Sequence, residues 1–290
     1  MEKLSVKPAG TVVLGGDVTV NRLGYGAMRI TGEGIWGPPK DRAGALAVLR
    51  RAVELGVNFI DTADSYGPDV SEELIAEALS PYPKDLIVAT KGGWKRFGPG
   101  QWGHDATPAH LRKAVEGSLK RLRVDRIDLY QLHIPDPVVS LSASIATLAK
   151  LQSEGKIRLI GLSNVTQEHV ERARRIVPIV SVQNRYSFAD REWDYVVDYC
   201  EKNKIVFIPW YPMAAGQAAD EAVRRIAKAG NAQPLQVALA WLLKRSPIML
   251  PIPGTSSVPH LEENIGAASL QLTEASFKEL YAVPEVTFSR

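Results

Sequence analysis

Four side chains that could take part in acid–base chemistry lie at or just after the ends of three short apolar stretches. They are a carboxylate, a phenol, an amine and an imidazole, on Asp61, Tyr66, Lys91 and His133. In a parallel β/α barrel the functional groups collect at the C-terminal ends of the strands and in the loops that follow them. If the apolar stretches are strands of such a sheet, the four groups meet at one rim. There they could protonate the oxygen of a carbonyl group.

The proton donor of such a set would be Tyr66. A free phenol has a pKa of about 10, so it gives up a proton poorly at neutral pH unless a neighbouring cation favours the phenolate. Lys91 could be that cation. Asp61, on the adjacent stretch, could supply the counter-charge that keeps a lysine protonated inside a barrel. His133 would then orient the carbonyl oxygen.

Each of these residues also has a purely structural interpretation when it is taken alone. Asp61 could cap the loop that follows it, and Tyr66 could be a half-buried packing residue with a satisfied hydroxyl. Lys91 could be a surface lysine whose alkyl chain covers apolar atoms. His133 could be a hydrogen-bonded core histidine. The occurrence of all four at successive strand ends favours the functional interpretation.

The order of apolar and amphipathic segments predicts the elements that would bring these residues together. After a hairpin signal at residues 11–14 and 18–20, short apolar stretches alternate with segments of helical apolar spacing. Strands are expected to begin near Leu23, Asn58, Leu86, Ile127, Ile157, Ile179, Val206 and Ile248. Helices are expected at residues 42–55, 71–79, 108–122, 141–153, 167–176, 192–203 and 235–244.

Eight such units favour a closed barrel over an open sheet. Apolar strands joined by helices imply a parallel sheet that is covered by helices. An open dinucleotide-binding sheet would normally carry G-x-G-x-x-G after its first strand, whereas Gly24-Tyr25-Gly26 continues without the third glycine. The sequence therefore predicts an α/β fold in which residues 1–290 form a single (β/α)₈ TIM barrel domain with a short N-terminal β-hairpin.

The composition argues against several other classes of protein. The net charge is only +3 and the lysines and arginines are scattered along helices, so no nucleic-acid-binding stripe is expected. Residues 1–10 lack the apolar core of a secretion signal, and the apolar stretches are too short to span a membrane. The single Cys200 falls in a helical apolar series and is expected to be a half-buried packing thiol without a disulfide partner. We therefore expect a cytoplasmic protein.

Five motifs, in this order along the chain, resemble those of the aldo-keto reductases. They are residues 61–67 (DTADSYG), Lys91, residues 131–133 (QLH), residues 161–164 (GLSN) and residues 252–255 (IPGT). The resemblance implies an enzyme that reduces the carbonyl of an aldehyde or ketone by hydride transfer from a nicotinamide dinucleotide. It also implies that Tyr66 is the general acid, that Lys91 and Asp61 tune it, and that His133 positions the substrate.

The same resemblance implies where the cofactor binds. Ser163, Asn164 and Gln183 match positions that hydrogen-bond the nicotinamide carboxamide, and Trp210 matches the aromatic residue on which the ring stacks. Taken alone, Trp210 could merely fill the barrel top, and Ser163 and Asn164 could cap the next helix. The other implied cofactor positions are Gly26, Ala27, Asp61, Thr255, Ser256, His260, Glu263 and Asn264.

The last loop bears on the choice between the two nicotinamide cofactors. It leads into a helix with Pro259 in the first turn, where free backbone N–H groups can face a phosphate. Many NADPH-specific members carry basic residues at the positions that are Gly254 and His260 here. Hydroxyls of Thr255 and Ser256 could still bind the 2′-phosphate. NADPH is expected by family analogy, with NADH as the second candidate.

Large aromatic residues in the loops after the first and third strands are expected to form the substrate wall. They are Trp36, Trp94, Phe97 and Trp102. The alternative is that each packs only against its own loop. Residues 21–28, 37–42 and 253–257 resemble a bacterial branch of the family that includes pyridoxal reductases. Pyridoxal is a flat aromatic aldehyde, which would suit an aromatic wall, and its reduction gives pyridoxine.

Two other functions remain open at this point. A lyase or aldolase could use Lys91 as a Schiff-base amine, because buried lysines shift their pKa readily. A barrel of this kind could also bind the dinucleotide as a non-catalytic regulatory subunit. No metal is expected, since none of the remaining histidines shows ligand spacing with Cys, Asp or Glu; these are His104, His110, His169 and His260. Family analogy favours a monomer whose partner is a small aldehyde or ketone.

Overall fold

A parallel sheet that curls into a barrel forms the centre of the computed structural model, which describes residues 4–211 and 221–285. Within these residues the sheet has seven strands in the order β11-β10-β9-β8-β5-β4-β3, and every neighbouring pair is parallel. The strands are β3 (Tyr25–Gly26), β4 (Phe59–Asp61), β5 (Ile87–Gly92), β8 (Ile127–Leu132), β9 (Ile157–Ser163), β10 (Ser181–Gln183) and β11 (Val206–Phe207).

Residues 248–252 close the barrel at the position of the eighth strand. The N–H of Leu250 donates to the carbonyl of Phe207 on β11 at 2.8 Å. On the other side, the N–H of Gly24, just before β3, donates to the carbonyl of Pro251 at 2.9 Å. Proline has no N–H, so this segment cannot complete a regular ladder. The prediction of a (β/α)₈ barrel is confirmed, with its eighth strand reduced to a few hydrogen bonds.

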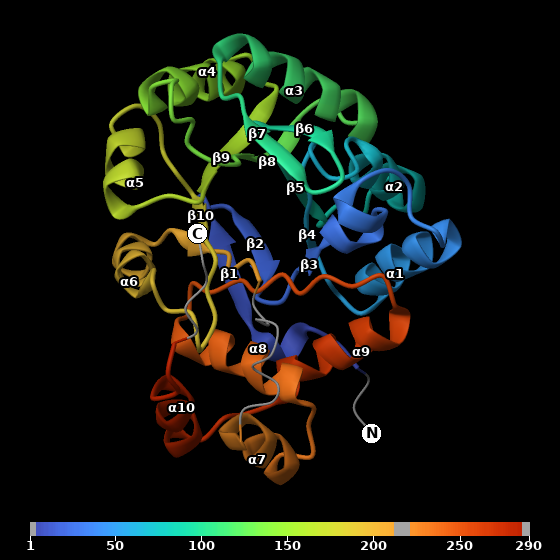
Figure 1. Cartoon of the computed structure of the whole chain (residues 1–290), viewed down its shortest axis with the longest axis vertical. Coiled ribbons are helices and arrows are strands. Elements are labelled where there is room, and N and C mark those ends of the chain that lie inside the picture. Colours follow the sequence, from blue (N-terminus) through green and yellow to red (C-terminus); the bar gives the residue numbers. More distant parts are fainter. Residues whose placement is uncertain (1–3, 212–220, 286–290) are drawn as a thin grey trace.

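Helices surround the barrel as an outer ring (Figure 1). They are α1 (Arg42–Glu54), α2 (Val70–Leu79), α3 (Pro108–Leu122), α4 (Leu141–Ser153), α5 (Gln167–Arg174), α6 (Asp194–Asn203), α7 (Glu221–Ala229), α8 (Pro234–Arg245), α9 (Val258–Gly266) and α10 (Glu274–Tyr281). The seven ranges predicted from apolar spacing differ from these bounds by at most two residues at either end. The sequence analysis did not identify α7 and α10, which lie outside the ring beside α8 (Figure 1).

Polar residues at the ends of the loops determine where several helices begin. The side chains of Thr107, Ser140 and Thr166 each accept a first-turn backbone N–H, at the starts of α3, α4 and α5. A cap of this kind satisfies one of the donors that the first turn leaves open. The starts of these helices are therefore determined by residues next to them in the sequence.

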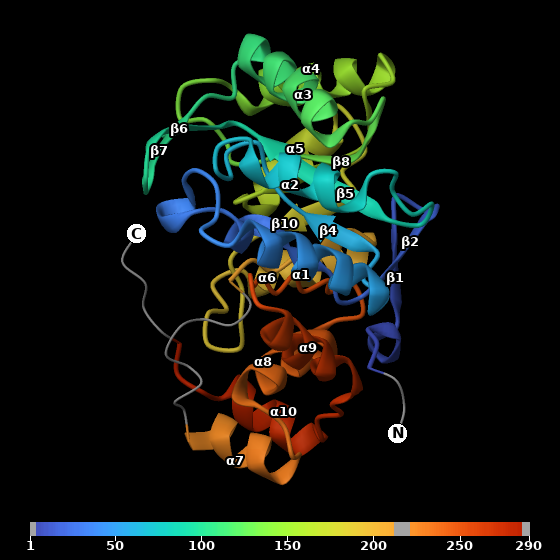
Figure 2. The ribbon, with the colours of Figure 1, turned by 90° about the vertical axis from the view of Figure 1, so that its right-hand side faces the viewer.

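Two antiparallel hairpins lie at opposite ends of the barrel (Figure 2). The first, β1 (Thr11–Leu14) and β2 (Val18–Asn21), was predicted, and its apolar side chains join the core inside the barrel. The second, β6 (Trp94–Gly98) and β7 (Gln101–His104), follows β5. We had expected an aromatic loop there. The aromatic residues of that stretch therefore lie on a paired ribbon at the end of the barrel to which β5 leads.

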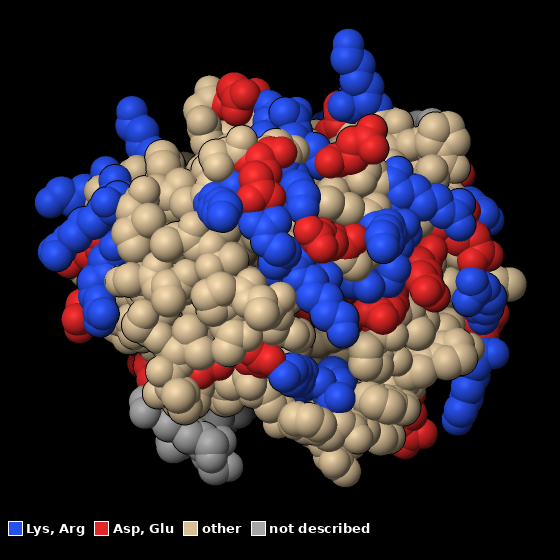
Figure 3. Space-filling model, turned by 90° about the horizontal axis from the view of Figure 1, so that it is seen from above, with Lys and Arg blue, Asp and Glu red and all other residues tan. Residues whose placement is uncertain are grey.

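Charges of both signs alternate on the outer helices. Figure 3 shows the face that carries α3 and α4, where Lys and Arg are interspersed with Asp and Glu. Arg112 pairs with Glu154 at 2.7 Å, and Lys156 pairs with Glu116 at 2.5 Å. Exposed pairs contribute little to stability. The mixture of signs leaves this face without the basic stripe that nucleic-acid binding requires.

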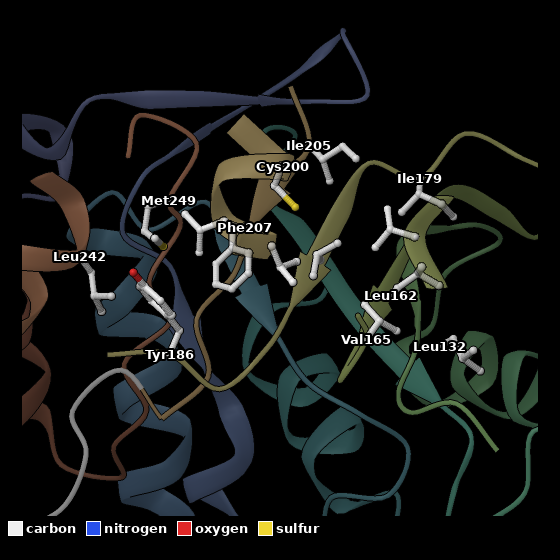
Figure 4. Close-up of a cluster of buried hydrophobic side chains, with 14 of the residues drawn as sticks. Leu132, Leu162, Val165, Ile179, Tyr186, Cys200, Ile205, Phe207, Leu242 and Met249 are labelled. Carbon is white, nitrogen blue, oxygen red and sulfur yellow. The ribbon is translucent and has the colours of Figure 1, made fainter. Parts of the chain in front are cut away.

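An apolar layer fills the space between the sheet and the helices. Figure 4 shows part of it, with Phe207 of β11, Leu162 of β9 and Cys200 of α6. Cys200 is fully buried, and this burial raises the pKa of its thiol to about 12. The thiol is therefore protonated at neutral pH. Its place in the core confirms the predicted packing role, but it is more deeply buried than the half-buried thiol that the sequence predicts.

Candidate active site

A buried ion pair lies at the C-terminal ends of β4 and β5. Lys91 Nζ is 2.5 Å from Asp61 Oδ1, and their side chains are 0% and 3% exposed. Lys91 Nζ also donates to the carbonyl of Thr62 at 2.9 Å. Burial by itself would lower the pKa of the amine, but the contacts with Asp61 and Tyr66 together outweigh burial and raise the pKa of Lys91. The residue is therefore an ammonium ion at neutral pH.

Two amide side chains hold the carboxylate from its other side. Gln131 of β8 and Gln183 of β10 each donate from Nε2 to Asp61 Oδ2 at 2.9 Å. With Lys91 on Oδ1, both oxygens of Asp61 have partners. The sequence analysis gave Gln131 no role of its own. Its place two residues before His133, on the same face of β8, was a signal that could have found it.

Tyr66 lies in the loop that follows β4. Its hydroxyl is 3.5 Å from Lys91 Nζ, and the ammonium is 5.2 Å from the centre of its ring. Burial raises the pKa of Tyr66, while the charge of Lys91 acts against that rise. The phenol therefore stays protonated at neutral pH. A cation lies beside the oxygen that becomes negative when the proton leaves.

His133 follows β8 and packs edge-on against Tyr66, with the ring centres 5.8 Å apart. Its Nδ1 is 3.4 Å from the hydroxyl oxygen of Ser65, a contact that the sequence analysis missed. Burial, together with the charge of Lys91, lowers the pKa of His133 well below its usual range. A neutral imidazole has one N–H donor and one acceptor nitrogen. The ring can therefore donate a hydrogen bond to a bound oxygen.

These groups border one cavity with a volume of about 520 Å³, within the range of small-molecule sites. Asp61, Tyr66 and His133 line it, and Lys91 lies behind them. The other lining residues are Gly26, Ala27, Met28, Arg29, Trp94, Trp102, Ile134, Ser163, Asn164, Gln183, Trp210, Tyr211, Ile252, Pro253 and Gly254. A second cavity of about 410 Å³, at residues 174–180 and the turn of the first hairpin, contains none of the four reactive groups.

Another set of polar side chains that line the cavity is held in place by its own hydrogen bonds. Asn164 Nδ2 donates to Ser163 Oγ at 3.1 Å and to the carbonyl of His133 at 3.0 Å. Trp210 Nε1 donates to Asn164 Oδ1 at 3.1 Å. An amide, a hydroxyl and a flat indole ring thus face the cavity in fixed orientations. They form a wall that could hold a planar ring bearing a carboxamide.

The backbones of β3 and the last loop approach each other closely at the edge of the cavity. A Cβ atom on Gly26 would lie 2.7 Å from the carbonyl oxygen of Ile252, and one on Gly254 would lie 2.6 Å from that of Gly26. Only glycine fits this approach. Five predicted cofactor residues lie beyond Gly254, outside the cavity lining: Thr255, Ser256, His260, Glu263 and Asn264. His260 and Glu263 are exposed on α9, and Asn264 is buried.

The structure brings two of the four predicted wall aromatics to the cavity. Trp94 and Trp102 line it, and Trp94 packs edge-on against His133 at 6.2 Å. Trp36 lies instead beside Arg96. The central carbon of the Arg96 guanidinium is 5.6 Å from the centre of the Trp36 ring. Phe97 is 68% exposed. Arg29, which also lines the cavity, was not predicted, because nothing in its spacing distinguishes it from a surface arginine.

Over residues 4–211 and 221–285, no group of three or more His, Cys, Asp or Glu side chains is arranged to hold a metal ion. The helices of the same residues include none that is long and apolar enough to cross a membrane.

Comparison with known families and sequences identifies close relatives. The model of the "Aldo/keto reductase family" matches residues 22–285. The chain is 50% identical over 274 residues to an uncharacterized oxidoreductase of Schizosaccharomyces pombe, covering 94% of this chain and 89% of the relative. It is 45% identical over 266 residues to pyridoxine 4-dehydrogenase of Escherichia coli, covering 89% of this chain and 93% of the relative.

Solved structures with this architecture span nearly the whole chain. A glycerol dehydrogenase from Gluconobacter oxydans superposes with a TM-score of 0.86 at 27% identity, covering 97% of this chain and 99% of its own. An aldo-keto reductase from Klebsiella pneumoniae in complex with NADPH gives a TM-score of 0.80 at 25% identity, covering 93% of both chains. The barrel therefore has a known architecture.

Proposed function

The chain belongs to the aldo/keto reductase family of NAD(P)H-dependent oxidoreductases, and we propose that it reduces the carbonyl of an aldehyde or ketone to an alcohol with Tyr66 as general acid. One observation carries this proposal. The hydroxyl of Tyr66 lies at the cavity wall, 3.5 Å from the ammonium of Lys91. A proton donor with a cation behind it is what a carbonyl oxygen needs as it gains negative charge.

Each residue of the set has a defined task in this proposal. Tyr66 transfers its phenolic proton to the carbonyl oxygen, and the ammonium of Lys91 stabilises the phenolate that remains. Asp61 keeps Lys91 charged. The neutral imidazole of His133 donates a hydrogen bond to the same oxygen and orients the carbonyl. Ser163, Asn164, Gln183 and Trp210 would hold a reduced nicotinamide, which would supply the hydride for the carbonyl carbon, so that the product alcohol would gain one hydride and one proton.

The polar part of the cavity lining fits a nicotinamide cofactor. Asn164, Ser163 and Gln183 present amide and hydroxyl groups suited to a carboxamide, and the indole of Trp210 offers a stacking surface. We propose NADPH as the preferred reductant. Two considerations support it: the Klebsiella pneumoniae relative binds NADPH, and Arg29 places a cation at the Gly254 edge of the cavity. The chain continues from this edge through Thr255 and Ser256 to the start of α9, and we propose that these residues contact the phosphates of the cofactor.

A flat aromatic aldehyde is the proposed substrate class, with pyridoxal as the first candidate. The relative from Escherichia coli is named for the oxidation of pyridoxine, which is the reverse of pyridoxal reduction. Trp94 and Trp102 form an aromatic wall next to His133. Aromatic rings stack or pack edge-on against such a wall.

The geometry weighs against a Schiff-base mechanism. A lysine attacks a carbonyl only as a neutral amine. The ammonium of Lys91 donates to Asp61, to the carbonyl of Thr62 and to Tyr66, and its pKa is raised. No feature of the described residues favours a non-catalytic dinucleotide-binding barrel either, because the four reactive groups converge.

A spectrophotometric screen tests the proposal. Purified protein is mixed with NADPH or NADH and a panel of aldehydes and ketones that includes pyridoxal, and loss of the reduced nicotinamide is followed. We expect aldehyde-dependent oxidation of NADPH that Tyr66→Phe abolishes and that the exposed control Tyr195→Phe retains. Turnover without added nicotinamide, or substrate trapped on Lys91 by borohydride, would establish a lyase instead. Tight NADPH binding with no turnover on any substrate would favour a regulatory barrel.

We further propose that residues 1–290 form one domain, and that the protein is a monomer in the cytoplasm. One domain predicts a single cooperative unfolding transition. Light scattering coupled to size exclusion measures the oligomeric state, and fractionation of cells measures the compartment. Two separate transitions, a dimeric mass or a membrane fraction would contradict the corresponding part.

A further inference from the structure

A single arginine outside the proposed catalytic set ties three segments together at the mouth of the cavity. Arg96 lies on β6, opposite Trp102 of β7 in the register of the hairpin. A two-stranded hairpin is only marginally stable by itself in water. The ribbon of β6 and β7 extends beyond the end of the barrel in Figure 2. It therefore needs contacts with other segments to keep a fixed position.

All five N–H groups of the Arg96 guanidinium donate to backbone carbonyls. The acceptors lie at 2.7–3.3 Å in three segments, on Gly34 and Ile35, on Ser65, and on Gly98 and Gln101. A guanidinium has five such donors in a rigid fork. No donor is left for a bound anion. The side chain therefore acts on the protein rather than on a charged ligand.

The same guanidinium lies against the aromatic wall. Its central carbon is 3.8 Å from the centre of the Trp102 ring and 5.6 Å from that of Trp36. Trp102 in turn packs edge-on against Trp94 at 5.6 Å. Cation–π contacts of this kind favour one placement of the ring. Fixing Arg96 thus fixes both tryptophans that line the cavity.

On its other side, Arg96 holds the loop that carries Tyr66. Ser65, whose carbonyl it binds, directly precedes Tyr66. The carbonyl of Ile35 accepts from both Arg96 and the N–H of Gly67, which directly follows Tyr66. Gly37 N–H donates to the carbonyl of Gly67 at 2.5 Å. The loop is therefore held on both sides of Tyr66 by segments that Arg96 joins to the hairpin.

We propose that Arg96 is a positioning residue that sets the distance between the aromatic wall and the hydroxyl of Tyr66, and thereby selects aromatic carbonyl substrates. The inference rests on the proposed carbonyl reduction. An aromatic aldehyde contacts the wall formed by Trp94 and Trp102, so its carbonyl reaches Tyr66 only if that wall is in place. A small aliphatic aldehyde makes few contacts with the wall and depends on it less.

The variant Arg96→Lys tests this, because it keeps the charge but replaces the fork with a single ammonium. The matched control is Arg112→Lys, which alters an ion pair with Glu154 on the outer surface. With NADPH, kcat and KM are measured for benzaldehyde and for propanal. For Arg96→Lys we expect kcat/KM for benzaldehyde to fall at least about tenfold and that for propanal to fall less than about threefold, since misplacement by about 1 Å can cost about 10²-fold. NADPH affinity and the control variant should be unchanged.

A second variant and a second measurement keep the inference testable if Arg96→Lys is poorly stable. Trp102→Leu leaves Arg96 in place but removes part of the wall, so it should show the same selective loss for benzaldehyde. Limited trypsin treatment of Arg96→Lys, which retains a cleavage site at residue 96, should cut the hairpin faster than in the wild type. An equal loss for both aldehydes, no loss for either, or unchanged cleavage would overturn the inference. A wild-type protein inactive on the whole carbonyl panel would refute the proposed function instead. The trypsin comparison would still test whether Arg96 holds the hairpin in place.

Discussion

Replacing Asp61 by asparagine removes the charge that balances Lys91 and should affect both stability and catalysis. The carboxylate accepts hydrogen bonds from Lys91, Gln131 and Gln183, at 2.5, 2.9 and 2.9 Å. An asparagine amide can accept only on its oxygen, so its NH₂ group must face either the ammonium or the two glutamine amides, all of which are donors. While Lys91 remains charged and the two glutamine amides keep their present orientation, one side of the residue therefore loses its hydrogen bonds.

The expected loss of stability follows from the burial of the pair. Lys91 and Asp61 are 0% and 3% exposed, so water cannot replace the lost partner. Removing one member of a buried pair typically costs about 3–5 kcal/mol. At roughly 2–4 °C per kcal/mol for a chain of this size, Tm should fall by about 10 °C. The exposed control Asp17→Asn, which loses an ion pair with Arg158, should change stability by less than about 1 kcal/mol.

The pH dependence of stability should also change sign. In the wild type the pKa of Lys91 is raised above its usual 10.5 by Asp61. The stability from this pair is therefore fully present below pH 10.5 and is lost as the pH rises through the higher folded value. Without Asp61, burial lowers the pKa of the amine. The unfolded chain then binds a proton that the folded chain does not, so the stability of Asp61→Asn should rise with pH up to about 10.5.

Thermal unfolding at neutral pH measures the change in Tm, and urea unfolding at several pH values between neutrality and pH 9.5 measures the pH dependence. Carbonyl reduction is assayed in parallel, and we expect it to fall by about 10²-fold or more, because Lys91 without its counter-charge holds its proton less firmly and stabilises the phenolate of Tyr66 less. A Tm within about 2 °C of the wild type would refute the reasoning that Lys91 is a buried cation. A stability that does not rise with pH in the variant would refute it independently.

Four further predictions concern single groups of the site. Tyr66→Phe should lower kcat/KM for aldehydes by about 10²-fold or more and leave NADPH affinity nearly unchanged; retained turnover would exclude it as the acid. The pKa of His133 is lowered in the folded protein, so below about pH 6.5 the unfolded chain binds a proton at this imidazole that the folded chain does not, and the wild type loses stability as the pH falls. His133→Gln lacks this proton uptake, so its stability, measured by urea unfolding, should fall less steeply with decreasing pH. His260→Arg should improve NADPH binding relative to NADH by about fivefold in fluorescence titrations, and an unchanged ratio would remove residue 260 from the phosphate site. Arg29→Gln should weaken NADPH binding by about tenfold if its guanidinium meets a cofactor phosphate, and unaltered binding would rule this out.

The alternation of apolar and amphipathic segments was sufficient to predict the barrel. Helix ranges could be predicted because each helix buries one face, and burial of one face fixes a periodicity that is visible in the chain. The eighth strand was predicted at Ile248, but Pro251 removes a donor there, so a few hydrogen bonds replace a ladder. The hairpin β6–β7 was missed because most of its residues are half-buried or exposed and show no apolar pattern.

The sequence by itself determined which strand ends carry Asp61, Tyr66, Lys91 and His133, because side-chain type and strand order are local properties. Only the tertiary structure decided how these groups are held. The two amides that grip Asp61 come from strands 70 and 122 residues away along the chain. Arg96 reaches carbonyls of loops on two other segments. Such partners are chosen by distance in space, and distance in space depends on the closure of the whole barrel rather than on any local pattern.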